Sequence, residues 1–165
     1  MAAREPRPVR LSQVASCELV RPMDTNVHGT IFGGRVVSLM DVTCAIAAAR
    51  HCGCPVVTAA IDEVHFLSPV KLGFVVNLMA SVNYTARTSM EVGVRVESEN
   101  PLTGERTHTA SAYFTFVALD AQGRPQEVPR VLPESPDEQR RCREAEARRA
   151  RRVHHREQRL KSRGQ

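Results

Sequence analysis

Hydrophobic and polar positions follow one pattern before residue 56 and another after it. Residues 11–20 alternate between apolar and polar side chains, which predicts a strand. Residues 35–51 carry apolar side chains around most of a helical wheel and no proline, so the pattern predicts a long helix buried on most sides. The "HCGCP" run ends this helix with glycine and proline.

The second half of the chain is patterned as strands. Four segments are rich in β-branched residues and are separated by "KLG", "RT" and "PLTG" turns; they span 56–70, 74–86, 89–100 and 105–120. "MEVGVRVE" alternates strictly, so one face of that strand is buried. A strand, a long helix and then four or more strands predict an α+β domain, in which an antiparallel meander wraps one central helix. This arrangement is the hot-dog fold.

Composition divides the chain into three parts. Residues 1–10 are polar and proline-bearing and are expected to form a flexible N-terminus. Residues 11–132 hold the predicted elements and form the domain. Residues 133–165 contain almost no large apolar residue and many charges, which predicts a solvated helix or a disordered tail.

The net charge of +5 belongs to the tail. Residues 134–165 contain eleven Lys and Arg against six Asp and Glu, whereas the rest of the chain holds twelve of each. A basic run can bind nucleic acid or an anionic membrane, but a solvated tail is the simpler interpretation. Aromatic residues make up 4% of the chain, with no Trp, and give little surface for stacking on bases. We therefore expect no specific nucleic-acid or membrane partner.

Five cysteines are present: Cys17, Cys44, Cys52, Cys54 and Cys142. Their number is odd, and the sequence shows neither a signal peptide nor an apolar run long enough to span a bilayer. We expect free thiols in a reducing cytoplasm. The "HCGC" run could suggest a metal site, but structural zinc needs four such ligands, so loop or core cysteines are the simpler interpretation. No metal and no other cofactor is expected.

One acid interrupts the apolar helix. Asp41 lies eight residues beyond Gly33, too far along to cap the helix start. It could be a structural acid bonded to Ser38 or to a neighbouring subunit, or a general base or nucleophile in a dry pocket. Gly33 and Gly34 could form a simple tight turn, or could expose the first helical amides to a developing oxyanion. A helix-start oxyanion hole with a carboxylate two turns further along suits thioester hydrolysis.

Four motifs carry a resemblance to a known family. They are "RPMDTNVHGTIFGGRVVSLMDVTCAIAAARHC", "VHFLSPVKLG", "ARTSMEVGVRVESENPLTGE" and "ASAYFTFVALD". In this order, over residues 12–129, the chain resembles the hot-dog acyl-CoA thioesterases, of the type of brain acyl-CoA hydrolase and its small bacterial relatives. The tail lies outside the resemblance.

The resemblance implies a fatty acyl-CoA hydrolase that releases fatty acid and CoA. It implies that Asp41 and Asn26 are catalytic and that backbone amides of Gly33 and Gly34 bind the oxyanion. It also implies that Asn26 of one subunit faces Asp41 of the other, in a homodimer assembled further as a trimer of dimers. On its own, Asn26 would be read as an Asx turn in a loop.

Further residues are implied as contacts of the substrate. The "ARTS" turn resembles the turn near the nucleotide, "FLSP" would line the pantetheine channel, and a histidine beside the glycines could touch the substrate. Without the resemblance, these are ordinary turns and an incidental loop histidine. The substrate-binding candidates are His28, Phe66, Ser68, Arg87, Thr88 and Ser89.

The alternative function is a non-catalytic acyl-CoA-binding or regulatory protein on the same fold, because a fold does not fix a function. A serine hydrolase is disfavoured, since no G-x-S-x-G elbow is present.

Overall fold

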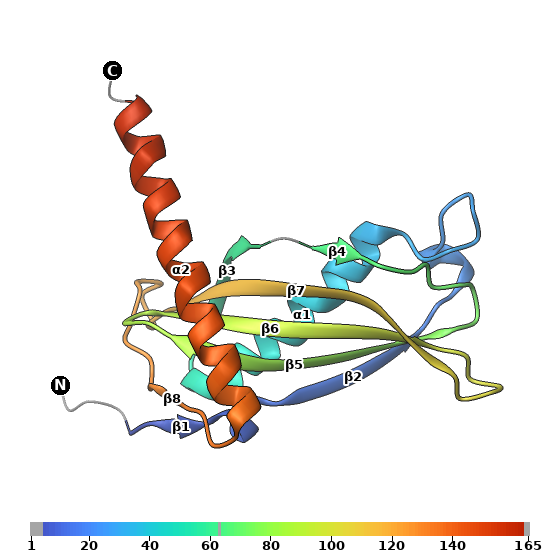
Figure 1. The fold of residues 1–165 in the computed structure, drawn as a ribbon, viewed down its shortest axis with the longest axis horizontal. Coiled ribbons are helices and arrows are strands. Elements are labelled where there is room, and N and C mark those ends of the chain that lie inside the picture. Colours follow the sequence, from blue (N-terminus) through green and yellow to red (C-terminus); the bar gives the residue numbers. More distant parts are fainter. Residues whose placement is uncertain (1–4, 63, 164–165) are drawn as a thin grey trace.

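The computed structural model describes residues 5–62 and 64–163 (Figure 1). The elements follow in the order β1 (Arg7–Pro8), η1 (Val9–Ser12), β2 (Val14–Leu19), η2 (Pro22–Asp24), α1 (Gly33–Cys52), β3 (Val56–Ile61), β4 (His65–Phe66), β5 (Val75–Thr85), β6 (Ser89–Glu99), β7 (Arg106–Ala118), β8 (Val131–Leu132) and α2 (Pro136–Arg163).

One antiparallel sheet forms the body of the domain. Its strands lie in the order β2-β5-β6-β7-β3, with β4 pairing to β7, while β1 and β8 form a small parallel pair. Helix α1 packs against β5, β6 and β7 on one face of this sheet, and Figure 1 shows it behind the curved strands. The predicted α+β hot-dog arrangement is therefore confirmed.

Alternation along the strands explains why the core lies on the α1 side. Met90, Val92, Val94 and Val96 are all buried and occupy every second position of β6, so they point to one face. The facing positions of β7 include Phe114 and Phe116, whose buried rings stack on each other. This apolar layer sets the position of α1, which carries several of the candidate site residues.

Helix α1 differs from its prediction in two ways. It begins at Gly33, so both glycines lie in its first turn rather than before it, and it ends where Gly53 adopts the left-handed conformation with φ 67°. It is also not buried on most sides: Val42 is 58% exposed and Ile46 is 42% exposed. The reason is that a single sheet covers one side of the helix, and no other element of the described residues covers Val42 and Ile46 on the other side.

The predicted strand over 56–70 is divided in two. Strand β3 ends at Ile61 after a register shift between Thr58 and Ala60, and β4 is a separate two-residue strand. Pro69, which has no amide hydrogen to donate, stands just beyond β4. Residues 66–70 then run beside the start of α1, where they line a cavity together with Gly33 and Val36.

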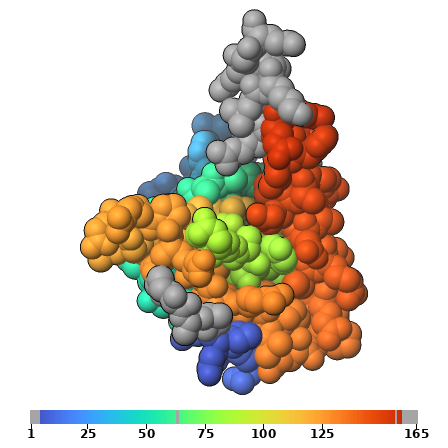
Figure 2. Space-filling view, turned by 90° about the vertical axis from the view of Figure 1, so that its left-hand side faces the viewer, coloured from blue at the N-terminus to red at the C-terminus, as the bar shows by residue number. Residues whose placement is uncertain are grey.

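The charged tail, for which a helix and a disordered segment were both open, forms α2. This helix crosses the sheet on the face opposite α1, and its end projects beyond the body (Figure 1). Figure 2 shows α2 as a ridge along one side of the molecule. Of the segment expected to be flexible, residues 1–4 lie outside the described residues, while residues 7–8 form β1. Neither described helix is long and apolar enough to cross a membrane.

Candidate active site

Asp41 accepts a hydrogen bond across the gap between α1 and β3. The Thr58 hydroxyl donates to Asp41 Oδ1 over 2.7 Å. Among the described residues, Thr58 is the hydrogen-bond partner of the carboxylate. Ser38, the partner expected if Asp41 were a structural acid, does not bond to it. One carboxylate oxygen is thereby fixed in direction, and the other keeps its lone pairs for a further partner.

The surroundings of Asp41 correct the expectation of an acid deep in an apolar helix. Asp41 is only half-buried, because it borders the side of α1 that carries the exposed Val42 and Ile46. A single chain therefore leaves this carboxylate partly solvated and its apolar neighbours uncovered.

Thr58 was missed by the sequence reasoning. It stands in a run of β-branched residues in which threonine is an ordinary strand residue. Only the placement of β3 beside the middle of α1 distinguishes it, and that is a tertiary relation without a local signal.

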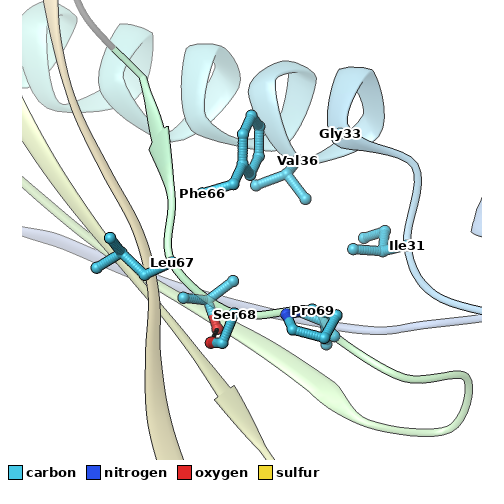
Figure 3. A pocket seen from close by; sticks show the side chains of 9 residues that line it. Ile31, Gly33, Val36, Phe66, Leu67, Ser68 and Pro69 are labelled. Carbon is cyan, nitrogen blue, oxygen red and sulfur yellow. Dashed lines mark hydrogen bonds between the residues drawn. The ribbon is translucent and has the colours of Figure 1, made fainter.

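The start of α1 opens on an apolar cavity of about 320 Å³ (Figure 3). The cavity is lined by Ile31, Gly33, Val36, Phe66, Leu67, Ser68, Pro69, Val70 and Thr109. Gly33 is packed under an aromatic ring, since a Cβ there would lie 3.4 Å from Phe66 Cζ. Of the predicted substrate contacts, Phe66 and Ser68 lie here, and the Ser68 hydroxyl donates to the His108 carbonyl over 3.1 Å.

The first turn of α1 has spare hydrogen-bond donors. No side chain caps the helix, and the amides of Arg35 and Val36 both donate to the Phe32 carbonyl. The described residues provide no acceptor for the amides of Gly33 and Gly34. These two N–H groups are available to an anion, and the helix dipole favours negative charge at this position.

Asn26 organises its own loop in this chain. Its Oδ1 accepts from the His28 amide over 2.9 Å, and its Nδ2 donates to Thr30 Oγ1 over 3.1 Å. This is the geometry of an Asx turn. His28 is exposed and does not line the cavity.

The turn predicted to contact the nucleotide lies at the other end of the sheet. Phe66 pairs with Ala110, which pairs with Val96, seven residues along β6 from Ser89. At about 3.3 Å per residue, the turn therefore lies about 23 Å along the strand from the position of Phe66 at the cavity. Arg87 is exposed and lies 3.9 Å from a Glu127 oxygen, and the Thr88 carbonyl accepts from the Ala118 amide. One chain does not bring Arg87, Thr88 and Ser89 together with the cavity.

The thiol of Cys44, which lies near Asp41, is not a competing nucleophile. Burial, and next the nearby charge of Asp41, raise the pKa of the Cys44 thiol, so it stays protonated. Among the described residues, no group of three or more His, Cys, Asp or Glu is placed to hold a metal ion. The His51 ring of the "HCGC" run instead binds the Pro129 carbonyl through Nε2 over 3.0 Å.

Comparison with known sequences identifies the family. The thioesterase superfamily matches residues 28–105. The chain is 44% identical over 138 residues to the uncharacterized acyl-CoA thioester hydrolase YkhA of Bacillus subtilis, covering 84% of this chain and 80% of that protein. It is 37% identical over 146 residues to the cytosolic acyl coenzyme A thioester hydrolase of mouse; the match covers 87% of this chain but only 38% of the mouse protein.

Solved structures agree. A hexameric acyl-CoA thioesterase, free of ligand, has a TM-score of 0.89 at 44% identity, covering 92% of this chain and 97% of that one. An acyl-CoA hydrolase of Staphylococcus aureus, as an asparagine-to-alanine variant with coenzyme A, has a TM-score of 0.87 at 36% identity, covering 98% and 99%. That enzyme has also been solved with an aspartate or a threonine replaced by alanine. The chain therefore belongs to the acyl-CoA thioester hydrolases, a family of the thioesterase superfamily.

Proposed function

We propose that this protein hydrolyses fatty acyl-CoA to fatty acid and CoA in the cytoplasm, with Asp41 as its catalytic carboxylate and without a metal or other cofactor. The observation that carries the proposal is the layout of α1. Its first turn offers two amides without acceptors beside an apolar cavity, and its middle holds a carboxylate oriented by the Thr58 hydroxyl.

These groups match the charges that hydrolysis creates. The thioester oxygen becomes negative in the tetrahedral intermediate, and the amides of Gly33 and Gly34 would donate to it. Asp41 would either take a proton from the attacking water or attack the carbonyl itself, and the carbon–sulfur bond then breaks as CoA leaves. The bond from Thr58 would hold the carboxylate in direction while leaving one oxygen to react.

A site shared between two chains fits what one chain lacks. The cavity and the Arg87 turn lie at opposite ends of one sheet, so one chain does not place them around a single compact site. Asp41 is half-exposed, and Val42 and Ile46 beside it are uncovered. A second copy across this side of α1 would cover them, and its Asn26 would then orient the water or the carbonyl. The similarity to a hexameric thioesterase supports assembly as a trimer of dimers.

The Staphylococcus aureus variants support the choice of residues. The asparagine, aspartate and threonine replaced in that enzyme have the same spacing along its chain as Asn26, Asp41 and Thr58 have here. Thr58 is therefore added to the proposed site on two grounds, its hydrogen bond and this correspondence.

The test is release of CoA from a chain-length series of acyl-CoA substrates, followed with a thiol-reactive dye. Asp41→Ala should lose at least about 100-fold in kcat, within the range expected for a general base or nucleophile. Asn26→Ala and Thr58→Val should lose less, because the carboxylate remains. Asp137→Ala, which removes an exposed acid at the start of α2, is the matched control and should keep full turnover.

Circular dichroism and the size of the assembly should be unchanged in the Asp41 variant. Full turnover by Asp41→Ala would remove Asp41 from the mechanism. Wild-type protein that binds acyl-CoA without releasing CoA at any chain length would instead establish the non-catalytic alternative.

A further inference from the structure

The connection between α1 and β3 contains two cysteines in contact. The Cys54 thiol points to the Cys52 sulfur, and the two Sγ atoms lie 3.1 Å apart. A disulfide bond measures about 2.05 Å, so a shift of about 1 Å would join them. Gly53 stands between them with φ 67°, in the left-handed region that glycine adopts readily, which gives the two side chains room to approach.

This pair can be reached from solvent. Cys54 is half-buried, whereas Cys52 is only 3% exposed. Cys52 and Gly53 also line a groove of about 630 Å³, together with residues 5–8, Leu11 and Pro129. A small reagent therefore has access to Cys54 directly and to the neighbourhood of Cys52 through the groove.

The other cysteines lack this arrangement. Cys17 is exposed, Cys44 is fully buried and Cys142 lies half-buried on α2; among the described residues, none of the three has another sulfur within hydrogen-bond distance. The pair at the end of α1 is thus distinguished from the rest by contact as well as by sequence.

We propose that Cys52 and Cys54 are a reversible oxidation site, which a low-molecular-weight disulfide such as oxidised glutathione converts into an intramolecular disulfide. The Cys54 thiolate attacks one glutathione sulfur, forms a mixed disulfide and releases one glutathione thiolate. The Cys52 sulfur, after losing its proton to solvent, then attacks Cys54 Sγ and expels the second glutathione. Two protein thiols are oxidised and one glutathione disulfide is reduced to two thiols.

The order of these steps follows from the surroundings. Burial raises the pKa of Cys52 to about 12, so Cys52 is the poorer first attacker. Once Cys54 carries glutathione, the two reacting sulfurs are already neighbours. Proximity of this kind speeds an intramolecular step greatly.

Peptide mass spectrometry tests the proposal directly. Cleavage after Arg50 and Lys71 gives one peptide, 51–71, which contains both cysteines of the pair and none of the others. The folded protein would be incubated with oxidised glutathione, quenched in acid and alkylated after unfolding. We expect most of this peptide to have lost two hydrogens and to carry neither glutathione nor alkyl groups. Dithiothreitol should restore two alkylated cysteines.

Two variants separate closure from ordinary glutathione addition. Cys52→Ser should accumulate a stable glutathione adduct on Cys54, because the resolving sulfur is missing. Cys17→Ser, the matched control at an exposed cysteine, should leave closure of the pair unchanged. A wild-type peptide that stays reduced, or that keeps glutathione on Cys54 as the serine variant does, would overturn the proposal.

Discussion

The two helices hold opposite faces of the same sheet by different physical means. Helix α1 lies on the apolar face, where its fully buried Met40 belongs to the same core cluster as Val92 and Phe114 of the sheet. Helix α2 lies on the other face, where its Arg148 reaches Glu91, a carboxylate only 2% exposed near the start of β6. The contact of α1 depends on how well apolar side chains fill the space, whereas the contact of α2 depends on charge and on the direction of hydrogen bonds.

The charged contact is a network. Arg148 Nη2 lies 2.7 Å from Glu91 Oε1, and its guanidinium carbon stands 3.5 Å from the centre of the Tyr113 ring. Arg152 bonds to the other Glu91 oxygen and also to Asp62. A buried carboxylate is costly unless its charge is matched, so the network selects one position of α2, whereas apolar packing alone tolerates shifts that keep the volume.

The largest loss of stability should come from the apolar face. Phe114→Ala should lower the free energy of unfolding by about 3–5 kcal/mol, because it removes a fully buried ring and leaves a cavity between β7 and α1. Urea denaturation at matched protein concentration measures the change, since assembly makes stability depend on concentration. A loss below about 1 kcal/mol would show that this face is loosely packed.

A smaller loss is expected on the charged face. Glu91→Gln keeps the shape but removes the charge that faces Arg148 and Arg152, and it should cost about 2 kcal/mol. Full burial of the unmatched cations would cost about 3–5 kcal/mol, but both arginines keep part of their surface in water. Hydrogen exchange should rise in α2 and stay unchanged in α1. Equal rises in both helices would contradict a separate docking of α2.

The two faces were not equally predictable. The helix α1 and the strict alternation of "MEVGVRVE" follow from periodicity, which is a local property. The same alternation put Glu91 on the face opposite the core, where an acid is expected to be solvated. That it is buried depends on an arginine 57 positions away, in a tail whose composition is typical of a solvated segment.

The proposed site shows the same division. Asp41 and the glycines stand out because they interrupt an apolar helix. Thr58 does not stand out, because its partner is set by how β3 lies beside α1. Sequence reasoning finds residues that break a local pattern and misses those whose role arises from tertiary contact.

The apolar side also contains a titratable ring, His51. We expect the neutral form of this ring to be favoured in the folded protein, rather than a charged form paired with an acid. Burial lowers the pKa of His51 from its usual 6.5, the bond to Pro129 opposes this, and the charge of Arg7 adds to the lowering. The described residues provide no partner for Nδ1, as expected of a neutral ring that donates from Nε2.

A depressed histidine pKa means that the unfolded chain binds a proton before the folded one does. Stability should therefore fall as pH drops below about 6.5. Urea denaturation of wild type and His51→Gln at pH 7.5 and 5.5 isolates this contribution, and the wild type should lose more on acidification. Equal losses would mean that His51 titrates normally in the folded protein.

The smallest effect should come from an exposed ion pair on α2, which shows whether charge alone or buried charge holds this helix. Arg140 and Glu144 lie one turn apart with a 2.9 Å contact and are 52% and 43% exposed. Water screens such a pair, and holding two long side chains in place costs entropy. A double-mutant cycle with alanine at both positions should give a coupling within the error of urea denaturation. A coupling as large as the effect of Glu91→Gln would show that α2 is stabilised by its own surface pairs rather than by docking on the sheet.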